Sequence, residues 1–173
     1  MKRIIIGSDH AGFRLKQRLK SYLIKLGFEV NDIGTYSSKR CDYPLIAYNL
    51  AHQISLRKFS RGILICNTGI GNSIVANRLP GVRAALCYNI KGARLSRQHN
   101  DSNLLVLGAA FVDSSLAKRM VGVWLRSSFL GGRHKRRLNQ IKKIEKHISF
   151  FNSRFSILDS RKRGKKVQKL LFS

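Results

Sequence analysis

The stretch from Gly62 to Gly71 constrains this chain most, because a short apolar run leads directly into a glycine-rich loop. The run Ile63–Ile65 has β-branched ends, which is typical of a strand buried on both faces. Cys66 follows this run, and a helical pattern begins near Asn72 after the glycines. Such a loop directs several backbone N–H groups at one point, where they can hold a phosphate or a developing oxyanion. A thiol beside that point could act as a base; the alternative is a phosphate loop with a buried structural cysteine.

Strand patterns alternate with helical patterns along the chain. Strands are expected at Arg3–Ser8, Phe28–Ile33, Ile63–Ile65, Val82–Cys87 and Leu104–Leu107. Helices are expected over residues 12–26, 42–55, 72–78, 89–97, 113–129 and 133–149. In the first helix the basic residues, Lys16 among them, are expected on the solvent face. The alternation predicts an α/β fold with a sheet of about five parallel strands and helices on both faces.

The charge of the chain is strongly basic, with 34 Lys and Arg against 8 Asp and Glu and a net charge of +26. The excess extends along the whole sequence and is densest after Arg133. It predicts attraction to anionic substrates and a non-specific affinity for nucleic acid. No helix-turn-helix, zinc-finger or RNP-like pattern accompanies it, so charge alone does not indicate a specific nucleic-acid site.

The three cysteines, Cys41, Cys66 and Cys87, have no metal-ligand spacing, so no metal site is expected. They are expected to be reduced thiols of a cytoplasmic protein. No apolar run approaches the length of a membrane span or of a signal peptide, so no membrane association is expected. From about residue 149 the composition changes to phenylalanines followed by the basic run Arg161–Lys166. This predicts a partly ordered basic extension over 149–173; a polyanion-binding arm is the alternative.

Polar side chains are expected to gather at the carboxyl edge of the sheet, where open α/β sheets bind ligands. They belong to Asp9-His10, Tyr43, Cys66–Gly71 and His99-Asn100. Each has an ordinary structural explanation as a cap or turn residue, and the set is informative only together. Arg133 and Arg137 are four residues apart, on one face of a helix. Their paired guanidinium groups suit a phosphate, or they belong to a solvated basic face.

Several motifs, in one order and spacing, resemble those of the type B ribose-5-phosphate isomerases, a family that includes the galactose-6-phosphate isomerase subunits. The similarity covers residues 3 to about 147. The motifs are Ser8–Phe13, Asp42–Pro44, Cys66–Ser73, Ala76–Arg78, Gly81–Ala85, Ala93–Asp101 and Gly131–His134.

The resemblance implies a Rossmann-like three-layer sandwich over residues 1–148. It further implies a homodimer or homotetramer with each active site between two subunits. The implied reaction is the interconversion of ribose 5-phosphate and ribulose 5-phosphate in the pentose phosphate pathway, without metal or cofactor. Galactose or allose 6-phosphate is the alternative substrate, and a polyanion-binding protein on this scaffold is the alternative function.

Catalytic roles also follow from the resemblance. His99 would protonate the ring oxygen to open the furanose, and Thr68 would assist in ring opening or shuttle a hydroxyl proton. Cys66, as a thiolate, would move a proton between C2 and C1. A free thiol is mostly protonated at pH 7, so Cys66 needs the loop amides and the helix start to lower its pKa. The enediolate would be stabilised by backbone N–H groups of Asn67, Gly69, Ile70 and Gly71.

Substrate-binding roles are implied in the same way. The phosphate would be held by His10, Arg133 and Arg137, and the sugar hydroxyls by Asp9, Tyr43 and Asn100.

Two positions depart from the family pattern, and a third assigns the chain to a branch. Asn67 replaces the usual glycine; if the position needs a positive φ, asparagine tolerates it better than most residues. Ala110 stands where the family usually has an arginine that reaches the substrate, so phosphate binding or sugar preference could shift. One branch of the family has a glutamate at the position of Asn72, so the uncharged Asn72 places this chain in the cysteine branch.

Overall fold

The structure of the protein, a computed structural model, describes the backbone of residues 2–160 and the side chains of residues 2–149. The basic run Arg161–Lys166 lies outside the described residues. The strands are β1 (Lys2–Ser8), β2 (Phe28–Asp32), β3 (Gly62–Cys66), β4 (Ala84–Leu86) and β5 (Leu104–Gly108). The helices are α1 (Phe13–Lys25), α2 (Tyr43–Ser55), α3 (Ile70–Ala76), α4 (Ile90–Asn100), α5 (Ser114–Arg126) and α6 (Gly132–Ser160).

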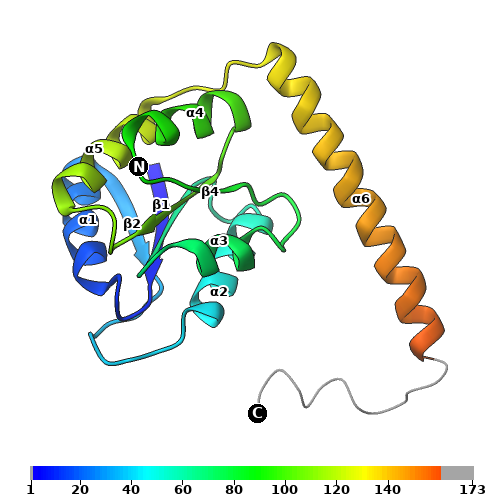
Figure 1. Ribbon diagram of the computed structural model, residues 1–173, viewed down its shortest axis with the longest axis horizontal. Helices are drawn as coiled ribbons and strands as arrows, with labels where there is room; N and C mark the ends of the chain where they lie inside the picture. The colour runs from blue at the N-terminus through cyan, green and yellow to red at the C-terminus, as the bar shows by residue number, and fades with distance from the viewer. Residues whose placement is uncertain (1, 161–173) are drawn as a thin grey trace. The chain divides into compact units, whose positions relative to one another are not determined.

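The five strands form one parallel sheet in the order β2-β1-β3-β5-β4 (Figure 1). The strand β3 is central, and all five of its residues are buried, which confirms the expectation from its apolar run. One apolar core joins the sheet to α1, α4 and α5 on one face, and a second joins it to α2 and α3 on the other. The predicted α/β sandwich with helices on both faces is therefore confirmed.

Most element boundaries agree with the sequence, and the exceptions have local causes. The edge strand β4 begins later than the expected Val82–Cys87, because the Val82 N–H bonds to Leu79 in a turn and the Arg83 N–H bonds to the Asn103 side chain. The helix α6 continues to Ser160 instead of ending near Ser149, and no glycine or proline interrupts that segment.

Lys16 corrects a prediction within α1, because its side chain is fully buried rather than solvated. Its Nζ lies 2.5 Å from a carboxylate oxygen of Asp32 and donates to the Thr35 carbonyl at 2.7 Å. Asp32 ends β2, and its carboxylate also accepts a hydrogen bond from Gly34 N–H. A buried ammonium requires such partners, so this lysine fixes the loop that follows β2. Helical periodicity alone does not show a buried ion pair.

The chain divides into two compact units, residues 1–134 and residues 135–173, and the boundary falls within α6. Every sequence-predicted site residue except Arg137 belongs to the first unit. Within the described part of the chain, no helix is long and apolar enough to cross a membrane.

Candidate active site

Cys66 is the last residue of β3, and the chain turns sharply directly after it. Its Sγ accepts a hydrogen bond from the Gly69 N–H at 3.1 Å. Gly69 has φ of +84°, and a Cβ there would overlap Leu86 and press on the backbone of Leu107 and Gly108. Only glycine fits this turn, which folds the loop back over the thiol and begins α3 at Ile70. The sequence pattern of strand, thiol, glycine loop and helix is therefore present in the structure.

The electrostatic environment of Cys66 differs from the sequence-based expectation. Burial raises the pKa of the thiol, and the neighbouring Asp9 carboxylate raises it further. Hydrogen bonds from the backbone N–H groups of Gly69, Asn72 and Thr68 act in the opposite direction without overcoming burial. The expected net lowering of the pKa is therefore not met within one chain, where burial outweighs the backbone N–H groups and raises the pKa.

Asp9 and His10 follow β1 at the same edge of the sheet. Asp9 is buried; its Oδ1 accepts a hydrogen bond from Gly12 N–H at 2.9 Å, and its own N–H donates to Ile65 O in β3. The His10 Nδ1 lies 3.2 Å from the backbone N and 3.0 Å from the backbone O of Cys41. These contacts fix both side chains beside the end of β3, so the structural and the substrate-binding interpretations are compatible.

Tyr43 begins α2 and lies against the start of α3. A Cβ on Gly71 would overlap the Tyr43 ring and its hydroxyl, so glycine is required for this close approach. The Thr68 Oγ1 accepts a hydrogen bond from Ile70 N–H at 3.2 Å, and the Thr68 carbonyl accepts one from the Tyr88 hydroxyl at 3.1 Å. Asp9, Tyr43 and the Cys66–Gly71 loop are thus gathered at the carboxyl edge, as predicted.

Asn67 and Ala110, which depart from the family pattern, are hydrogen-bonded to each other through their backbones. The Ala110 N–H donates to the Asn67 carbonyl at 2.9 Å. Among the described non-glycine residues, only Arg57 and Asp101 have a positive φ, so Asn67 needs no special backbone tolerance. The side chain of Ala110 ends at a methyl group, so this position offers no charge to a phosphate.

His99 and Asn100 do not join this group within one chain, so that prediction is wrong. They form the last turn of α4, and α4 runs antiparallel to the strands. The following Asn103 accepts a hydrogen bond from the N–H of Gly62, the first residue of β3. Cys66 stands at the other end of β3, roughly 13 Å away along the strand at about 3.3 Å per residue. His99 therefore lies at the amino edge of the sheet.

A second group of polar residues surrounds His99 at this amino edge. The ring of His99 stacks on that of His134, with centroids 4.1 Å apart and planes 8° apart. His134 is buried, and its N–H bonds to the Gly131 carbonyl at the start of α6. Arg133 immediately precedes it, whereas Arg137 belongs to the second unit. Asp101 and His134 lie within the motifs of the sequence but were not expected in the site, and the ring of His134 contacts that of the predicted site residue His99.

Among the described residues, no group of three His, Cys, Asp or Glu side chains could hold a metal ion. The side chains of the two groups can supply general acid and base chemistry and anion binding. One contains a thiol under backbone N–H donors, and the other contains an imidazole and a guanidinium. A substrate needing both a ring-opening acid and a proton-transferring base would need both groups at once.

The buried side chain of Asn72 destabilises the fold. Asn72 is 1% exposed, and neither its amide nitrogen nor its amide oxygen has a hydrogen-bond partner among the described residues. An unsatisfied buried polar group costs about 1–3 kcal/mol. We therefore expect Asn72→Leu to raise the free energy of unfolding by about 1–2 kcal/mol in urea denaturation.

The matched control is Asn77→Leu, because the Asn77 amide is paired with both backbone groups of Ala84. That change should lower the free energy of unfolding by about 1 kcal/mol or more. A loss of stability in Asn72→Leu as large as in the control would show that the Asn72 amide is satisfied in solution.

Comparisons with known proteins place most of the chain in one family. The family described as Ribose/Galactose Isomerase matches residues 4–141. The ribose-5-phosphate isomerase B of Escherichia coli K12 is 46% identical over 145 residues, 84% of this chain and 97% of the relative. The D-erythrulose-4-phosphate isomerase of Pectobacterium atrosepticum is 41% identical over 133 residues, 76% of this chain and 88% of the relative.

A solved structure supports the same relationship. Ribose-5-phosphate isomerase B from Mycoplasma genitalium, with bound ribulose-5-phosphate, is 40% identical with a TM-score of 0.80. The match covers 83% of this chain and 96% of that chain.

Proposed function

Because this chain belongs to the ribose/galactose isomerase family, a family of sugar phosphate isomerases, we propose that it interconverts ribose 5-phosphate and ribulose 5-phosphate. The observation that carries the proposal is the placement of Cys66 at the end of β3, beneath the N–H groups of a glycine loop. A base and an oxyanion-binding site in one place suit the transfer of a proton next to a carbonyl group.

The proposed reaction passes through an enediolate. The Cys66 thiolate removes the C2 proton of the open-chain aldose, and the bonding electrons move toward C1 to place negative charge on the carbonyl oxygen. The backbone N–H groups of Asn67, Gly69, Ile70 and Gly71 stabilise that charge. Return of the proton to C1 then gives the ketose and restores the thiolate. Thr68 relays the proton of the C2 hydroxyl to the C1 oxygen, so that C2 becomes the carbonyl carbon, while Asp9 and Tyr43 hold the other sugar hydroxyls.

We infer that a second copy of the chain completes each site. His99, Asn100 and Arg133 lie at the amino edge of the sheet, whereas Cys66 lies at the carboxyl edge. Exposed apolar side chains on α3 and the neighbouring loops support a contact with another copy, because solvated surfaces seldom gather such residues. Ile70, Ile74, Tyr88 and Phe111 are 39–58% exposed. The assembly is a homodimer or a homotetramer.

In this arrangement His99 of one copy protonates the ring oxygen of a sugar bound at Cys66 of the other. Arg133 and Arg137, with His10, hold the phosphate. Arginine suits this role because its fork matches two phosphate oxygens at once. With Ala110 in place of the family's arginine, that position adds no positive charge to this phosphate site.

The test is a comparison of kcat/KM for ribose 5-phosphate, allose 6-phosphate and galactose 6-phosphate on the purified full chain. We expect ribose 5-phosphate to be preferred by at least about 10-fold, because an added carbon unit in a closed site typically changes discrimination by 10- to 200-fold. A higher kcat/KM for either six-carbon substrate would contradict the proposed substrate and leave the reaction class intact. Absence of turnover on all three would contradict the proposed function.

A further inference from the structure

We propose that Asp101 and Arg83 are positioning residues, which hold the last turn of α4 so that His99 meets the substrate in a fixed orientation. This inference rests on the proposed function, because it acts through the role assigned there to His99. Neither residue belongs to the site residues expected from the sequence.

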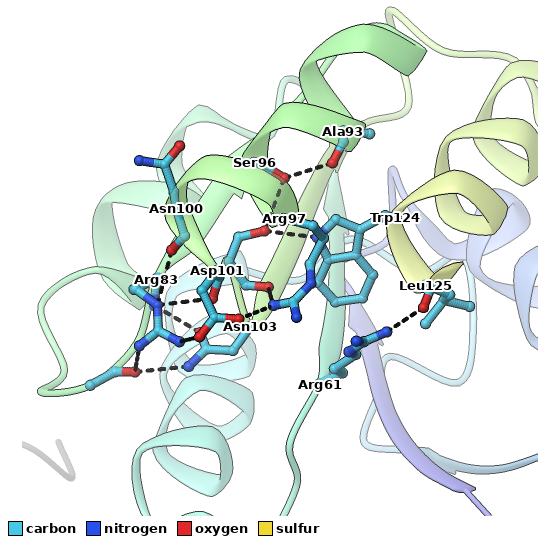
Figure 2. Close-up of polar contacts among 12 residues, drawn as sticks. Arg61, Arg83, Ala93, Ser96, Arg97, Asn100, Asp101, Asn103, Trp124 and Leu125 are labelled. Atoms are coloured by element: carbon cyan, nitrogen blue, oxygen red, sulfur yellow. Dashed lines mark hydrogen bonds and ion pairs between the residues drawn. The ribbon is translucent and has the colours of Figure 1, made fainter. Parts of the chain in front are cut away.

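Arg83 connects the start of β4 to the end of α4 (Figure 2). Its Nε donates to the carbonyl of Asn100 at 3.1 Å and to that of Asp101 at 2.9 Å. Its Nη2 lies 2.8 Å from the Asp101 Oδ2. A single planar fork therefore occupies two of the carbonyl groups that a helix end leaves unsatisfied, and one carboxylate oxygen.

Arg97 binds the same carboxylate from the other side. Its Nη1 lies 2.8 Å from the Asp101 Oδ1 and donates to the Ser102 carbonyl at 2.6 Å. Arg97 is buried, and its guanidinium stands over the Trp124 ring at 5.9 Å. The Trp124 Nε1 donates to the Ser102 hydroxyl at 2.8 Å, so α5 is joined to the same network (Figure 2).

The Asp101 carboxylate is thus shared by two arginines, and its own backbone is held in an uncommon conformation. Its φ is +47°, in the left-handed region, where few non-glycine residues lie. This conformation ends α4 and directs the chain into β5. The end of α4 has little freedom to move, because the Asp101 carboxylate forms an ion pair on each side. His99, two residues earlier in the same turn, is held with it.

The network is larger than the capping of a surface helix requires. A glycine or asparagine in the left-handed conformation would end the helix with no ion pair. Two arginines on one acid, with a tryptophan beside them, instead make a rigid support beside a proposed acid group. Catalytic geometry is sensitive to such support, since a displacement of about 1 Å can cost about 100-fold in rate.

The experiment is a double-mutant cycle on the full chain with ribose 5-phosphate as substrate. Asp101→Asn keeps the shape and the tolerance of the left-handed conformation but removes the charge. We expect it to lower kcat by about 10- to 100-fold. In a His99→Asn background, the same change should lower kcat by less than about 3-fold, because a residue that acts only through His99 has nothing left to position.

Two further variants make the result decisive. Arg83→Lys keeps the positive charge but cannot span two carbonyls and a carboxylate. It should therefore also lower kcat when His99 is present and change kcat little in the His99→Asn background. Glu29→Gln is the matched control, because it breaks an ion pair with Arg3 that lies on the exposed end of β1. The control should leave kcat unchanged. Thermal unfolding of each variant shows whether the fold is retained, and Arg83→Lys serves if Asp101→Asn fails to fold.

The outcomes separate this inference from the proposed function. An equal loss of kcat in both backgrounds would overturn the positioning role, since the effect would then be on the fold in general. A loss no larger than that of Glu29→Gln would overturn it as well. If His99→Asn alone kept the full kcat, the acid assigned to His99 in the proposed function would be wrong, and the positioning role would fall with it.

Discussion

Replacing Cys66 by alanine should lower kcat for ribose 5-phosphate by about 100- to 10,000-fold, because a base in contact with the transferred proton contributes a factor of that size. Alanine removes only the Sγ atom and introduces no new group, so folding should be retained. The measurement is the initial rate of ketose formation, together with the thermal unfolding midpoint of the variant.

The matched control for this substitution is Cys87→Ala. Cys87 is also a buried thiol, and burial raises its pKa to about 11. It packs in the core beside α4 and takes no part in the proposed site. We expect kcat to change by less than about 2-fold, within the usual effect of a remote core substitution on activity. A comparable loss in both variants would mean that the effect of Cys66→Ala is structural.

The pH dependence of the wild-type reaction should carry the signature of the same thiol. Burial raises the pKa of Cys66 above its ordinary value of 9.0. The thiolate is the reactive form, and its fraction grows with pH below the pKa. The value of kcat/KM should therefore increase continuously between pH 7 and pH 9. A flat profile over this range would show that Cys66 is already deprotonated or that another group is the base.

The fold could be predicted from the sequence because its strongest patterns are local. The run Ile63–Ile65 identifies the central strand, and Gly27 and Asp113 identify the end of α1 and the start of α5. Both latter signals are present in the structure, as a positive φ at Gly27 and a hydrogen bond from Leu116 N–H to the Asp113 carboxylate. Such features depend on one or two neighbouring residues, so a linear pattern contains them.

Features that depend on distant partners could not be predicted in the same way. Lys16 fits a helix surface by its spacing, and only the return of β2 brings Asp32 to it. The helix α4 continues beyond Arg97 because Asp101 and Arg83 secure its end, and Arg83 lies in another part of the chain. That extension carries His99 to the edge of the sheet opposite Cys66.

The candidate site therefore divides into a part that the sequence located and a part that it misplaced. The loop from Cys66 to Gly71 is local and lies where parallel sheets bind ligands. The position of His99 follows from the direction of α4, and the pKa of Cys66 follows from the burial of its side chain. The spacing of residues in the sequence predicts neither property. The proposed second copy of the chain is what would bring the two edges together in one active site.

The most direct test of this account is subunit complementation between Cys66→Ala and His99→Asn. Each variant alone should have little activity. The two variants are co-expressed with different tags, and all dimers are purified together. With random pairing, about half of the dimers contain one Cys66→Ala chain and one His99→Asn chain. In the proposed shared arrangement, one of the two sites in such a dimer combines Cys66 of one chain with His99 of the other, so about a quarter of wild-type activity should return.

Co-expression of Cys66→Ala with Cys66→Ser is the control, because no combination of these chains contains the thiol. Recovery of about a quarter of the wild-type kcat in the first mixture, and none in the second, is the result predicted for a site shared between two copies. Absence of recovery in the first mixture, with mixed assemblies present, would contradict the shared site and place Cys66 and His99 in separate functions.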